Sequence, residues 1–268
     1  MMQPDKMRVV LTGATGGIGS ELARQLYSRG ASLLLVGRNE IALENLKAQL
    51  GERVQVCCAD ITLHEDRQKL VNASSAFQAN VLVNSAGMNV FSLLEDNDES
   101  DVEAVFSLNV VSVIALVRAM LPSLLEHRPA LLVNVGSILG SIGMPGYTLY
   151  CSSKFALRGF TEALQREYAD TQNLIIKYIA PRATKTAINS ASVCAMNSEL
   201  GNAMDEPAAV ASEIIDFMCS SGNMRFMGWP EKLFVKINAV LPAMVSGSFM
   251  KQLPVIRRYA RQERGTGS

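Results

Sequence analysis

Short hydrophobic runs alternate with amphipathic stretches along most of the chain. The runs consist mainly of aliphatic and β-branched residues, which is typical of strands that are covered on both faces. They lie at residues 9–11, 32–36, 54–58, 81–83, 131–133 and 174–179, and a short run near residues 225–227 is expected to close the sheet. Because strands of this kind belong to parallel sheets, the pattern predicts a parallel sheet.

Between these runs, hydrophobic residues recur three and four positions apart, which predicts helices. After the first run, Ile18, Leu22, Ala23 and Leu26 follow this spacing. Further helices are expected over residues 40–50, 64–77, 101–121, 150–169 and 207–219. Gly51 is expected to end one helix as a left-handed cap, and Pro207 to open the last one.

Strands separated by helices require right-handed crossovers, so the order of elements predicts an α/β fold. We expect a Rossmann-type doubly wound parallel sheet with helices on both faces, in a single domain, with its ligand at the carboxyl ends of the strands. Residues 1–229 would form the main body, and residues 230–268 a C-terminal helical extension with a basic tail. Residues 182–206 lack strong periodicity and predict a mobile lid.

Charge and composition restrict the classes of partner and the compartment that we expect for this protein. The 25 Lys and Arg residues balance 25 Asp and Glu residues, so no global positive field favours nucleic acid. No apolar run approaches the roughly 18 residues of a spanning helix. An odd number of cysteines, with Cys57 and Cys58 inside a strand pattern, and the absence of a secretory signal pattern over residues 1–8 favour the cytoplasm. We expect no metal.

A glycine-rich turn, TGATGGIG at residues 12–19, connects the first strand to the first helix. Glycines let the backbone approach a pyrophosphate, while the helix N-terminus offers N–H donors and partial positive charge. Glycines also occur merely to permit positive φ, but a strand before the turn and a helix after it favour phosphate binding. The spacing is Gly-x-x-x-Gly-x-Gly, which differs from the Gly-x-Gly-x-x-Gly dinucleotide fingerprint.

Tyr150 and Lys154 are four residues apart at the start of a predicted helix, so they share one face. Such pairs are common on helices and mean little alone. Ser137 follows the fifth strand, where its hydroxyl would hydrogen-bond a substrate oxygen and stabilise developing alkoxide charge. We expect the lysine charge and a bound oxidised nicotinamide together to lower the pKa of Tyr150 from its usual value of about 10, so that the phenol serves as general acid and general base.

Taken together, these motifs resemble those of the classical short-chain dehydrogenase/reductase family. The resemblance covers roughly residues 8–230 and rests on motifs in the expected order: the turn at 12–19, Asp60, Asn84-Ser85-Ala86-Gly87, Asn109, Ser137, Tyr150-x-x-x-Lys154 and Pro181. It implies hydride transfer between a nicotinamide dinucleotide and a carbonyl or alcohol. Residues 1–229 would then be the Rossmann-fold NADP(H)-binding catalytic domain.

The resemblance also implies which residues contact the cofactor. Asp60 would accept a hydrogen bond from the adenine amino group, with Ile61 beside the ring, and residues 84–87 would pass the adenosine ribose and brace the sheet. A helix cap at Asp60, with Thr62 the better-placed cap, and a plain turn at 84–87 are the alternatives. The expected cofactor-binding residues are Gly13, Thr15, Gly17, Ile18, Gly19, Arg38, Asp60, Ile61, Asn84, Ala86, Gly87, Tyr150, Lys154, Pro181, Thr184 and Thr186.

The end of the second strand selects between the two nicotinamide cofactors. A carboxylate there binds the ribose 2′-hydroxyl, whereas an arginine accommodates a 2′-phosphate. The sequence reads Val36-Gly37-Arg38-Asn39, and no Asp or Glu occupies the competing place. Because Arg38 can make a charge-assisted contact to phosphate, we expect NADP(H), with a solvated surface arginine as the alternative.

In the family, the lysine also holds the nicotinamide ribose, and an asparagine in the preceding helix anchors a water that relays protons to it. Asn109 matches this asparagine, and a polar residue at a helical kink is the alternative. The catalytic residues are thus expected to be Asn109, Ser137, Tyr150 and Lys154. The family usually has Pro-Gly after the sixth strand, where this chain has Pro181-Arg182. We expect Arg182 to be an outward, salt-bridged side chain, with contact to a polar or anionic substrate group as the alternative.

The C-terminal extension combines an apolar helical stripe with a basic tail. The stripe contains Leu233, Phe234, Ile237, Val240 and Leu241, and the tail contains Lys251, Arg257, Arg258, Arg261 and Arg264. We expect this segment to pack over the substrate cleft or against a second subunit. Peripheral contact with an anionic membrane is the alternative.

The leading hypothesis is an NADP(H)-dependent carbonyl reductase or alcohol dehydrogenase that acts on a ketone or secondary alcohol, with a lipophilic or acyl-type substrate. A homo-oligomer is expected, with a dimer favoured. A non-catalytic NADP(H)-binding sensor or scaffold protein of the same fold is the alternative. A sugar-nucleotide epimerase or dehydratase is disfavoured by the glycine spacing and by the small C-terminal region.

Overall fold

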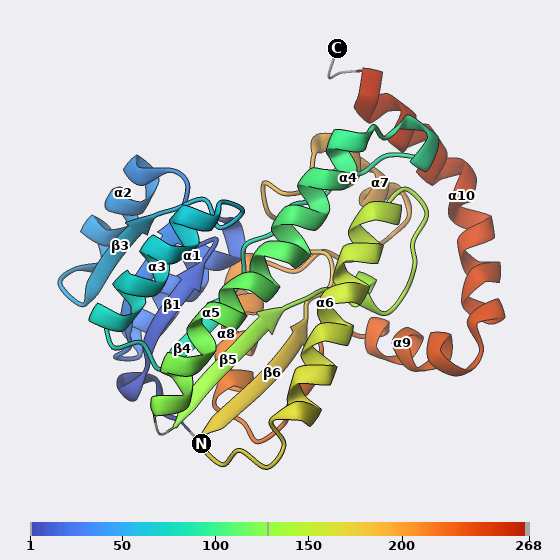
Figure 1. Ribbon diagram of the computed structural model, residues 1–268. Coiled ribbons are helices and arrows are strands. Elements are labelled where there is room, and N and C mark those ends of the chain that lie inside the picture. The colour runs from blue at the N-terminus through green and yellow to red at the C-terminus, as the bar shows by residue number, and fades with distance from the viewer. Residues whose placement is uncertain (1, 128, 266–268) are drawn as a thin grey trace.

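The computed structural model describes residues 2–127 and 129–265, which form a seven-stranded parallel sheet in the order β3-β2-β1-β4-β5-β6-β7 (Figure 1). The strands are β1 (Arg8–Thr12), β2 (Ser32–Gly37), β3 (Val54–Cys58), β4 (Val81–Asn84), β5 (Ala130–Val135), β6 (Leu174–Ala180) and β7 (Met224–Phe226). The predicted doubly wound parallel sheet is confirmed. Strand order reverses between β1 and β4, which pair directly, so a ligand crevice is expected at their carboxyl ends.

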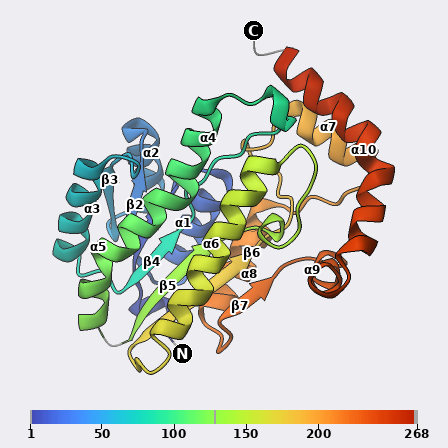
Figure 2. The same cartoon turned by 45° about the vertical axis from the view of Figure 1, so that its right-hand side comes forward.

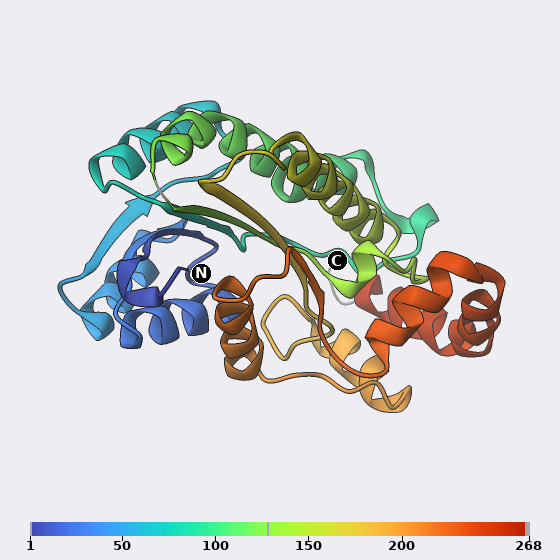
Figure 3. The same ribbon diagram turned by 90° about the horizontal axis from the view of Figure 1, so that it is seen from below.

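Helices cover both faces of the sheet (Figure 3). One layer contains α1 (Gly17–Ser28), α2 (Glu40–Leu50) and α8 (Pro207–Met218). The other contains α3 (His64–Ala76), α4 (Glu99–Phe106), α5 (Ser112–Glu126) and α6 (Thr148–Glu167). Each layer buries its aliphatic stripe against the all-apolar strands, and this burial stabilises the fold.

The helix predicted over residues 101–121 is longer and less regular than expected. A π-helical turn, η3 (Ser107–Val111), joins α4 to α5. The combined stretch Glu99–Glu126 is, among the described residues, the one helix long and apolar enough to cross a membrane, and an 18-residue window of it has a mean hydropathy of 2.1. The expectation that no apolar stretch reaches this length is therefore wrong. A core helix passes the same test, and Leu116, Val117 and Met120 are buried in the layer on the sheet.

Two loop predictions also need correction. Gly51 has a positive φ of 117°, but its ψ of −157° lies outside the left-handed helical region, so it is not the predicted left-handed cap. The segment 182–206 contains a helix, α7 (Ala191–Glu199), in which only two apolar residues, Val193 and Met196, are buried, too few to give a periodic signal.

The C-terminal part forms a further layer beside the sheet. It consists of α9 (Glu231–Val240) and α10 (Pro242–Gly265), and α10 runs along the edge of the molecule next to α7 (Figure 2). Ile256 and Ala260 of α10 are buried against Val193 and Met196 of α7. The extension therefore covers the side of the molecule on which the strands end.

Candidate active site

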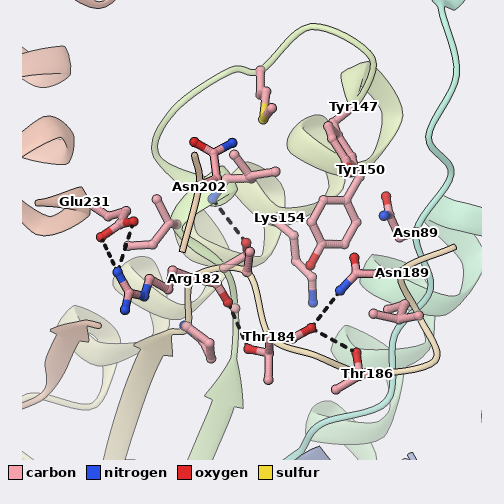
Figure 4. Close-up of a pocket in the computed structure, with 18 of the residues that line it drawn as sticks. Asn89, Tyr147, Tyr150, Lys154, Arg182, Thr184, Thr186, Asn189, Asn202 and Glu231 are labelled. Atoms are coloured by element: carbon pink, nitrogen blue, oxygen red, sulfur yellow. Dashed lines mark hydrogen bonds and ion pairs between the residues drawn. The ribbon is translucent and has the colours of Figure 1, made fainter. Parts of the chain in front are cut away.

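A cavity of about 870 Å³ opens at the carboxyl ends of the central strands, beneath the lid and α9–α10 (Figure 4). One end is lined by the glycine turn between β1 and α1. The other end is mainly apolar and contains Leu139, Ile142, Met144, Ile188, Phe234, Val245 and Phe249. The cavity thus joins a backbone-lined half to a hydrophobic half.

The glycine turn leaves no space for side chains. Gly13 has a φ of +66°, and a Cβ atom there would lie 2.7 Å from the Cα of Ala86. A Cβ on Gly19 would lie 2.1 Å from the carbonyl oxygen of Gly13. The cap residue Gly16 gives α1 no side-chain cap, so the first N–H groups of the helix are open to a ligand. These features fit the pyrophosphate of a dinucleotide.

Arg38 and Thr15 line a second hollow together with Asn39, Glu40 and Ile41. Asn39 caps α2, because its Oδ1 accepts a hydrogen bond of 2.9 Å from the N–H of Ala42. The guanidinium suits a phosphate, and no carboxylate stands at the end of β2 itself. Glu40, two residues after Arg38 in the first turn of α2, nevertheless lines the same hollow.

Asp60 and Ile61 line neither hollow. The Asp60 carboxylate accepts hydrogen bonds from the N–H and the hydroxyl of Thr62, at 2.9 and 2.7 Å. Burial acts to raise the pKa of Asp60, but these bonds and the charge of Arg38 outweigh it and hold the pKa below its usual value. Ile61 is buried in the core. Because α3 begins at His64 after Leu63, neither Asp60 nor Thr62 is its cap.

Asn84 lies behind the cavity and joins two strands to a helix. Its Nδ2 donates to Asn134 Oδ1 at 2.9 Å, and Asn134 Nδ2 donates to Thr161 Oγ1 on α6 at 2.9 Å. The side chain of Asn84 is buried, whereas Ala86 and Gly87 line the cavity. Asn84 therefore braces the sheet, and the two following small residues are the ones exposed to a ligand.

Tyr150 and Lys154 lie on successive turns of α6, side by side, with their polar ends pointing the same way (Figure 4). The Lys154 Nζ is 5.7 Å from the centroid of the Tyr150 ring and donates to the Val135 carbonyl at 3.3 Å. Ser137 follows β5, and its Oγ accepts a 3.1 Å hydrogen bond from the N–H of Leu139. The parallel pairing of β5 with its neighbours brings this hydroxyl to the cavity next to the tyrosine.

In the protein alone, the pKa of Tyr150 is shifted in the direction opposite to the one expected with oxidised nicotinamide bound. Burial raises the pKa of Tyr150 to about 12, although a hydrogen bond with Ser137 opposes the shift. Burial also lowers the pKa of Lys154 to about 8, which weakens the charge that was expected to act on the phenol. Removal from water favours the neutral form of both groups. The phenol therefore keeps its proton at neutral pH.

Asn109 is fully buried in the π-helical turn. Its Oδ1 accepts from the N–H of Met88 at 2.9 Å, and its Nδ2 donates to the Met88 carbonyl at 2.9 Å and to Ser153 Oγ at 3.0 Å. These bonds tie the segment after β4 to α6, next to Lys154. Asn109 acts as a positioning residue, and π turns are frequent at functional sites. The water relay implied by the resemblance stays a prediction.

Arg182 is salt-bridged but does not point outward. Its Nη2 is 2.7 Å from Asp205 Oδ1, and its Nη1 is 3.2 Å from Glu231 Oε2. The side chain is 17% exposed and lines the cavity, so the expected outward orientation is wrong. Asp205 and Glu231 together compensate the charge of Arg182. Because Arg182 and Asp205 lie at the two ends of the lid and Glu231 lies in α9, these ion pairs join the lid to α9.

The lid contacts the glycine turn directly. A Cβ on Gly17 would lie 2.5 Å from Thr186 Cγ2. Thr184 is buried, its hydroxyl donates to the Arg182 carbonyl at 2.9 Å, and its own carbonyl accepts from Asn189 Nδ2 at 2.7 Å. The lid backbone after Pro181 is therefore held over the nucleotide half of the cavity.

Several polar residues of the cavity were not predicted from the sequence, among them Asn89, Tyr147 and Asn202 (Figure 4). The Tyr147 ring meets the Tyr150 ring edge-on, with centroids 6.4 Å apart. The Asn89 side-chain oxygen is buried without a hydrogen-bond partner among the described residues. Because these residues lie in loops with no regular spacing, only the chain topology brings them to the site.

The cavity brings together twelve of the predicted residues, namely Gly13, Gly17, Ile18, Gly19, Ala86, Gly87, Ser137, Tyr150, Lys154, Pro181, Thr184 and Thr186. Thr15 and Arg38 line the second hollow. Asp60, Ile61, Asn84 and Asn109 line neither. Residues 2–127 and 129–265 contain no group of three or more His, Cys, Asp or Glu side chains suited to a metal ion.

Comparison with known proteins identifies the family. Residues 7–196 match the family model described as short chain dehydrogenase. Nodulation protein G of Rhizobium sp. (strain N33) is 32% identical over 183 residues, which are 68% of this chain and 74% of that protein. The 3-ketodihydrosphingosine reductase of Bos taurus is 36% identical over 169 residues, 59% of this chain and 51% of that protein.

Solved structures share the fold. A short chain dehydrogenase from Burkholderia cenocepacia in complex with NADP has a TM-score of 0.80 at 22% identity, covering 92% of this chain and 99% of that one. A short chain dehydrogenase/reductase from Burkholderia phymatum in complex with NAD has a TM-score of 0.80 at 24% identity, covering 89% and 95%. The match over residues 7–196, together with the glycine turn and the Ser137, Tyr150 and Lys154 cluster, shows that the chain belongs to the short-chain dehydrogenase family.

Proposed function

We propose that the protein is an NADPH-dependent reductase of lipophilic ketones, within the oxidoreductase chemistry of its family. The observation that carries the proposal is the position of Tyr150. Its protonated hydroxyl and Ser137 line the same cavity as the glycine turn and the apolar side chains. A proton donor in this cavity is suited to a carbonyl of a substrate that the apolar side chains bind.

When bound, the nicotinamide supplies or accepts the hydride. Ser137 donates a hydrogen bond to the substrate oxygen and stabilises negative charge as it develops there. Tyr150 transfers its proton to the same oxygen in reduction and takes it back in oxidation. Lys154 lies beside the phenol and would bind the nicotinamide ribose hydroxyls, while Asn109 holds the segment after β4 in place.

The choice of NADPH over NADH rests on Arg38. The guanidinium and the Thr15 hydroxyl offer donors to a 2′-phosphate at the end of β2. Glu40 opposes this preference because its carboxylate would repel a phosphate. We infer that the cation is dominant, since arginine contacts a phosphate through several donors while the carboxylate of Glu40 can turn to solvent.

The substrate class rests on the apolar half of the cavity. Side chains of several elements, including Ile142, Ile188, Phe234 and Phe249, surround the space beyond the Tyr150 hydroxyl. Arg182 offers no free charge to an anionic group, because two carboxylates already pair with it. Burial of hydrocarbon would contribute about 0.8 kcal/mol per CH₂ group.

The test measures NADPH oxidation with a homologous series of methyl ketones of increasing chain length. We expect kcat/KM to rise about fourfold per added CH₂ until the apolar half is filled. Tyr150→Phe should keep NADPH affinity within about twofold yet lower kcat by at least about 100-fold. A kcat/KM that is independent of chain length would contradict the assignment of a lipophilic substrate. Substantial turnover by Tyr150→Phe would contradict the proposed role of the tyrosine.

A further inference from the structure

Exposed hydrophobic side chains concentrate at the start of the C-terminal layer. Of the large hydrophobic residues that are exposed in the described chain, seven lie between residues 229 and 250. They are Trp229, Leu233, Phe234, Val240, Leu241, Met244 and Met250. We call residues 229–251 the C-terminal surface. Single exposed hydrophobic residues are common on protein surfaces and need no partner. A group of them on one surface instead marks an interaction site.

Helical geometry places the exposed side chains on the outer sides of α9 and α10. Val235 of α9 and Val245 of α10 are buried against the cavity wall. Leu233 and Val240 lie on the face of α9 away from Val235, and Met250 lies on the face of α10 away from Val245, with exposed Met244 on its flank. Both helices stand at the end of the molecule farthest from α2 and β3 (Figure 1).

Basic residues surround this apolar group. Lys232 and Lys236 are exposed on α9, Lys251 is exposed on α10, and Arg257 and Arg261 continue its outer face. Residues 229–268 carry seven of the 25 Lys and Arg residues but only two of the 25 Asp and Glu residues, so the rest of the chain is net acidic. The positive charge is therefore local to the C-terminal layer.

The nearby acidic side chains are already bound to inner partners. Glu231 pairs with Arg182, and Glu263 accepts a hydrogen bond of 2.8 Å from Ser190. Glu199 on α7 pairs with Arg258 and accepts from the Tyr259 hydroxyl at 2.9 Å. Each of these carboxylates is therefore paired with a group other than Lys232, Lys236 or Lys251.

This charge distribution distinguishes between the two candidate partners of the C-terminal surface, a second copy of the chain and a lipid bilayer. A two-fold interface would place the same patch of a second copy opposite, and like charges would face like charges. An anionic bilayer instead offers hydrocarbon to the apolar side chains and phosphate to the lysines. We propose that the C-terminal surface docks the protein onto the interface of an anionic lipid bilayer.

The cavity reaches this surface. Trp229 and Phe234 are 65% and 40% exposed and also line the cavity. Docking therefore brings the mouth of the cavity to the acyl chains, so that a ketone dissolved in the bilayer reaches Tyr150 without crossing water. This last step rests on the proposed function, whereas docking itself does not.

The test uses the full-length protein and sedimentation with sucrose-loaded vesicles, without substrate. One set is phosphatidylcholine and the other is phosphatidylcholine mixed with phosphatidylglycerol. We expect binding to the anionic vesicles to be at least about tenfold tighter, and to weaken as salt is raised. Failure of the wild-type protein to sediment with either set overturns the proposal and leaves the reductase assignment untouched.

Variants locate the contact. Val240→Asp/Leu241→Asp/Met244→Asp should lower the affinity for anionic vesicles by at least about tenfold, and Lys232→Glu/Lys236→Glu should do so for anionic vesicles alone. The matched controls are Leu63→Asp/Leu94→Asp, which also replaces exposed hydrophobic residues, and Lys6→Glu/Lys47→Glu, both away from this surface. The controls should bind as the wild type does. Circular dichroism and NADPH binding verify folding of each variant.

A second copy of the chain is the competing occupant. Sedimentation equilibrium without lipid distinguishes it, because the Val240→Asp/Leu241→Asp/Met244→Asp variant keeps the wild-type mass if the surface binds lipid. A smaller mass for the variant would identify a subunit interface and overturn the proposal, as would vesicle binding that the variant retains in full.

Discussion

Tyr150 and Lys154 are removed from water by the same helix and the same cavity wall. Each is therefore shifted toward its neutral form, with the pKa of the phenol at about 12 and the pKa of the amine at about 8. A phenol that retains its proton is ready to donate it to a carbonyl. The oxidation direction then needs an additional positive charge close to the hydroxyl, because only such a charge favours the phenolate.

The buried lysine lowers stability in a pH-dependent way. Its pKa in the folded protein is about 8, below the ordinary value of 10.5, so the folded state binds fewer protons than the unfolded chain between these values. The destabilisation is complete below about pH 8 and fades as pH rises to about 10.5. We predict that Lys154→Met raises the free energy of unfolding by about 1–3 kcal/mol at pH 7.

Urea unfolding of both proteins at several pH values measures this effect. The difference between Lys154→Met and the wild type should shrink as pH rises above 8. Lys6→Met, at an exposed position, should show no such pH dependence. A stability difference that stays constant over this range would show that burial of the charge is not its cause.

Arg38 and Glu40 share one hollow with opposite charges. Arg38→Asp should raise the KM for NADPH at least about tenfold and leave the KM for NADH within about threefold, because it removes the phosphate contact. Glu40→Gln is the matched variant and should lower the KM for NADPH, since it removes a repulsive carboxylate. Steady-state kinetics with both cofactors measure the changes, and equal effects of Arg38→Asp on both cofactors would refute the assignment.

Single residues could be predicted from the sequence where a motif fixes their place at a strand end. Ser137, Tyr150, Lys154 and Pro181 all line the cavity as the resemblance implied. Burial, charge balance and side-chain direction could not be predicted in this way. The inward position of Arg182 depends on Asp205 and Glu231, which are distant in sequence and supply its partners.

At the scale of elements, the glycine turn and α6 provide a matched pair of substitutions. Gly19→Ala places a methyl group 2.1 Å from the Gly13 carbonyl, whereas a Cβ on Gly159 has no neighbour within 4 Å. We predict that Gly19→Ala weakens NADPH binding at least about tenfold, because the turn must open.

Gly159→Ala should instead raise the free energy of unfolding by about 0.5–1 kcal/mol, since alanine is the better helix former in the middle of α6. Isothermal titration with NADPH and thermal unfolding distinguish the two effects. Normal NADPH affinity in Gly19→Ala would contradict the close packing of the turn.

Most elements could be predicted from hydrophobic periodicity, and the strands agree within two residues at each end. The exceptions have physical causes. The π turn in the long helix adds one residue to a turn without changing the average apolar spacing, so the pattern does not reveal it. The short helix α7 is stabilised by packing against α10 rather than by its own sequence.

At the scale of the molecule, the π-helical turn η3, α5 and α6 also expose hydrophobic residues, namely Val111, Ile114 and Phe155. We predict that this face joins two subunits of a homodimer. Val111→Glu/Phe155→Glu should yield a monomer in sedimentation equilibrium, because buried charge without a partner is strongly unfavourable in an interface. Leu63→Glu/Leu94→Glu should leave the mass unchanged, and a wild-type protein that is already monomeric would exclude the dimer.

The wall that α9 and α10 build around the apolar half of the cavity has an evolutionary consequence. The proposed catalytic residues precede residue 197, inside the stretch that matches the family, and so do Leu139, Ile142, Met144 and Ile188 of the apolar half, whereas Phe234, Val245 and Phe249 follow it. The proposed substrate site is thus encoded in two parts of the gene, and one of its walls lies beyond the stretch that matches the family. Exchange of the final helices would change that wall while the proposed catalytic residues are inherited intact.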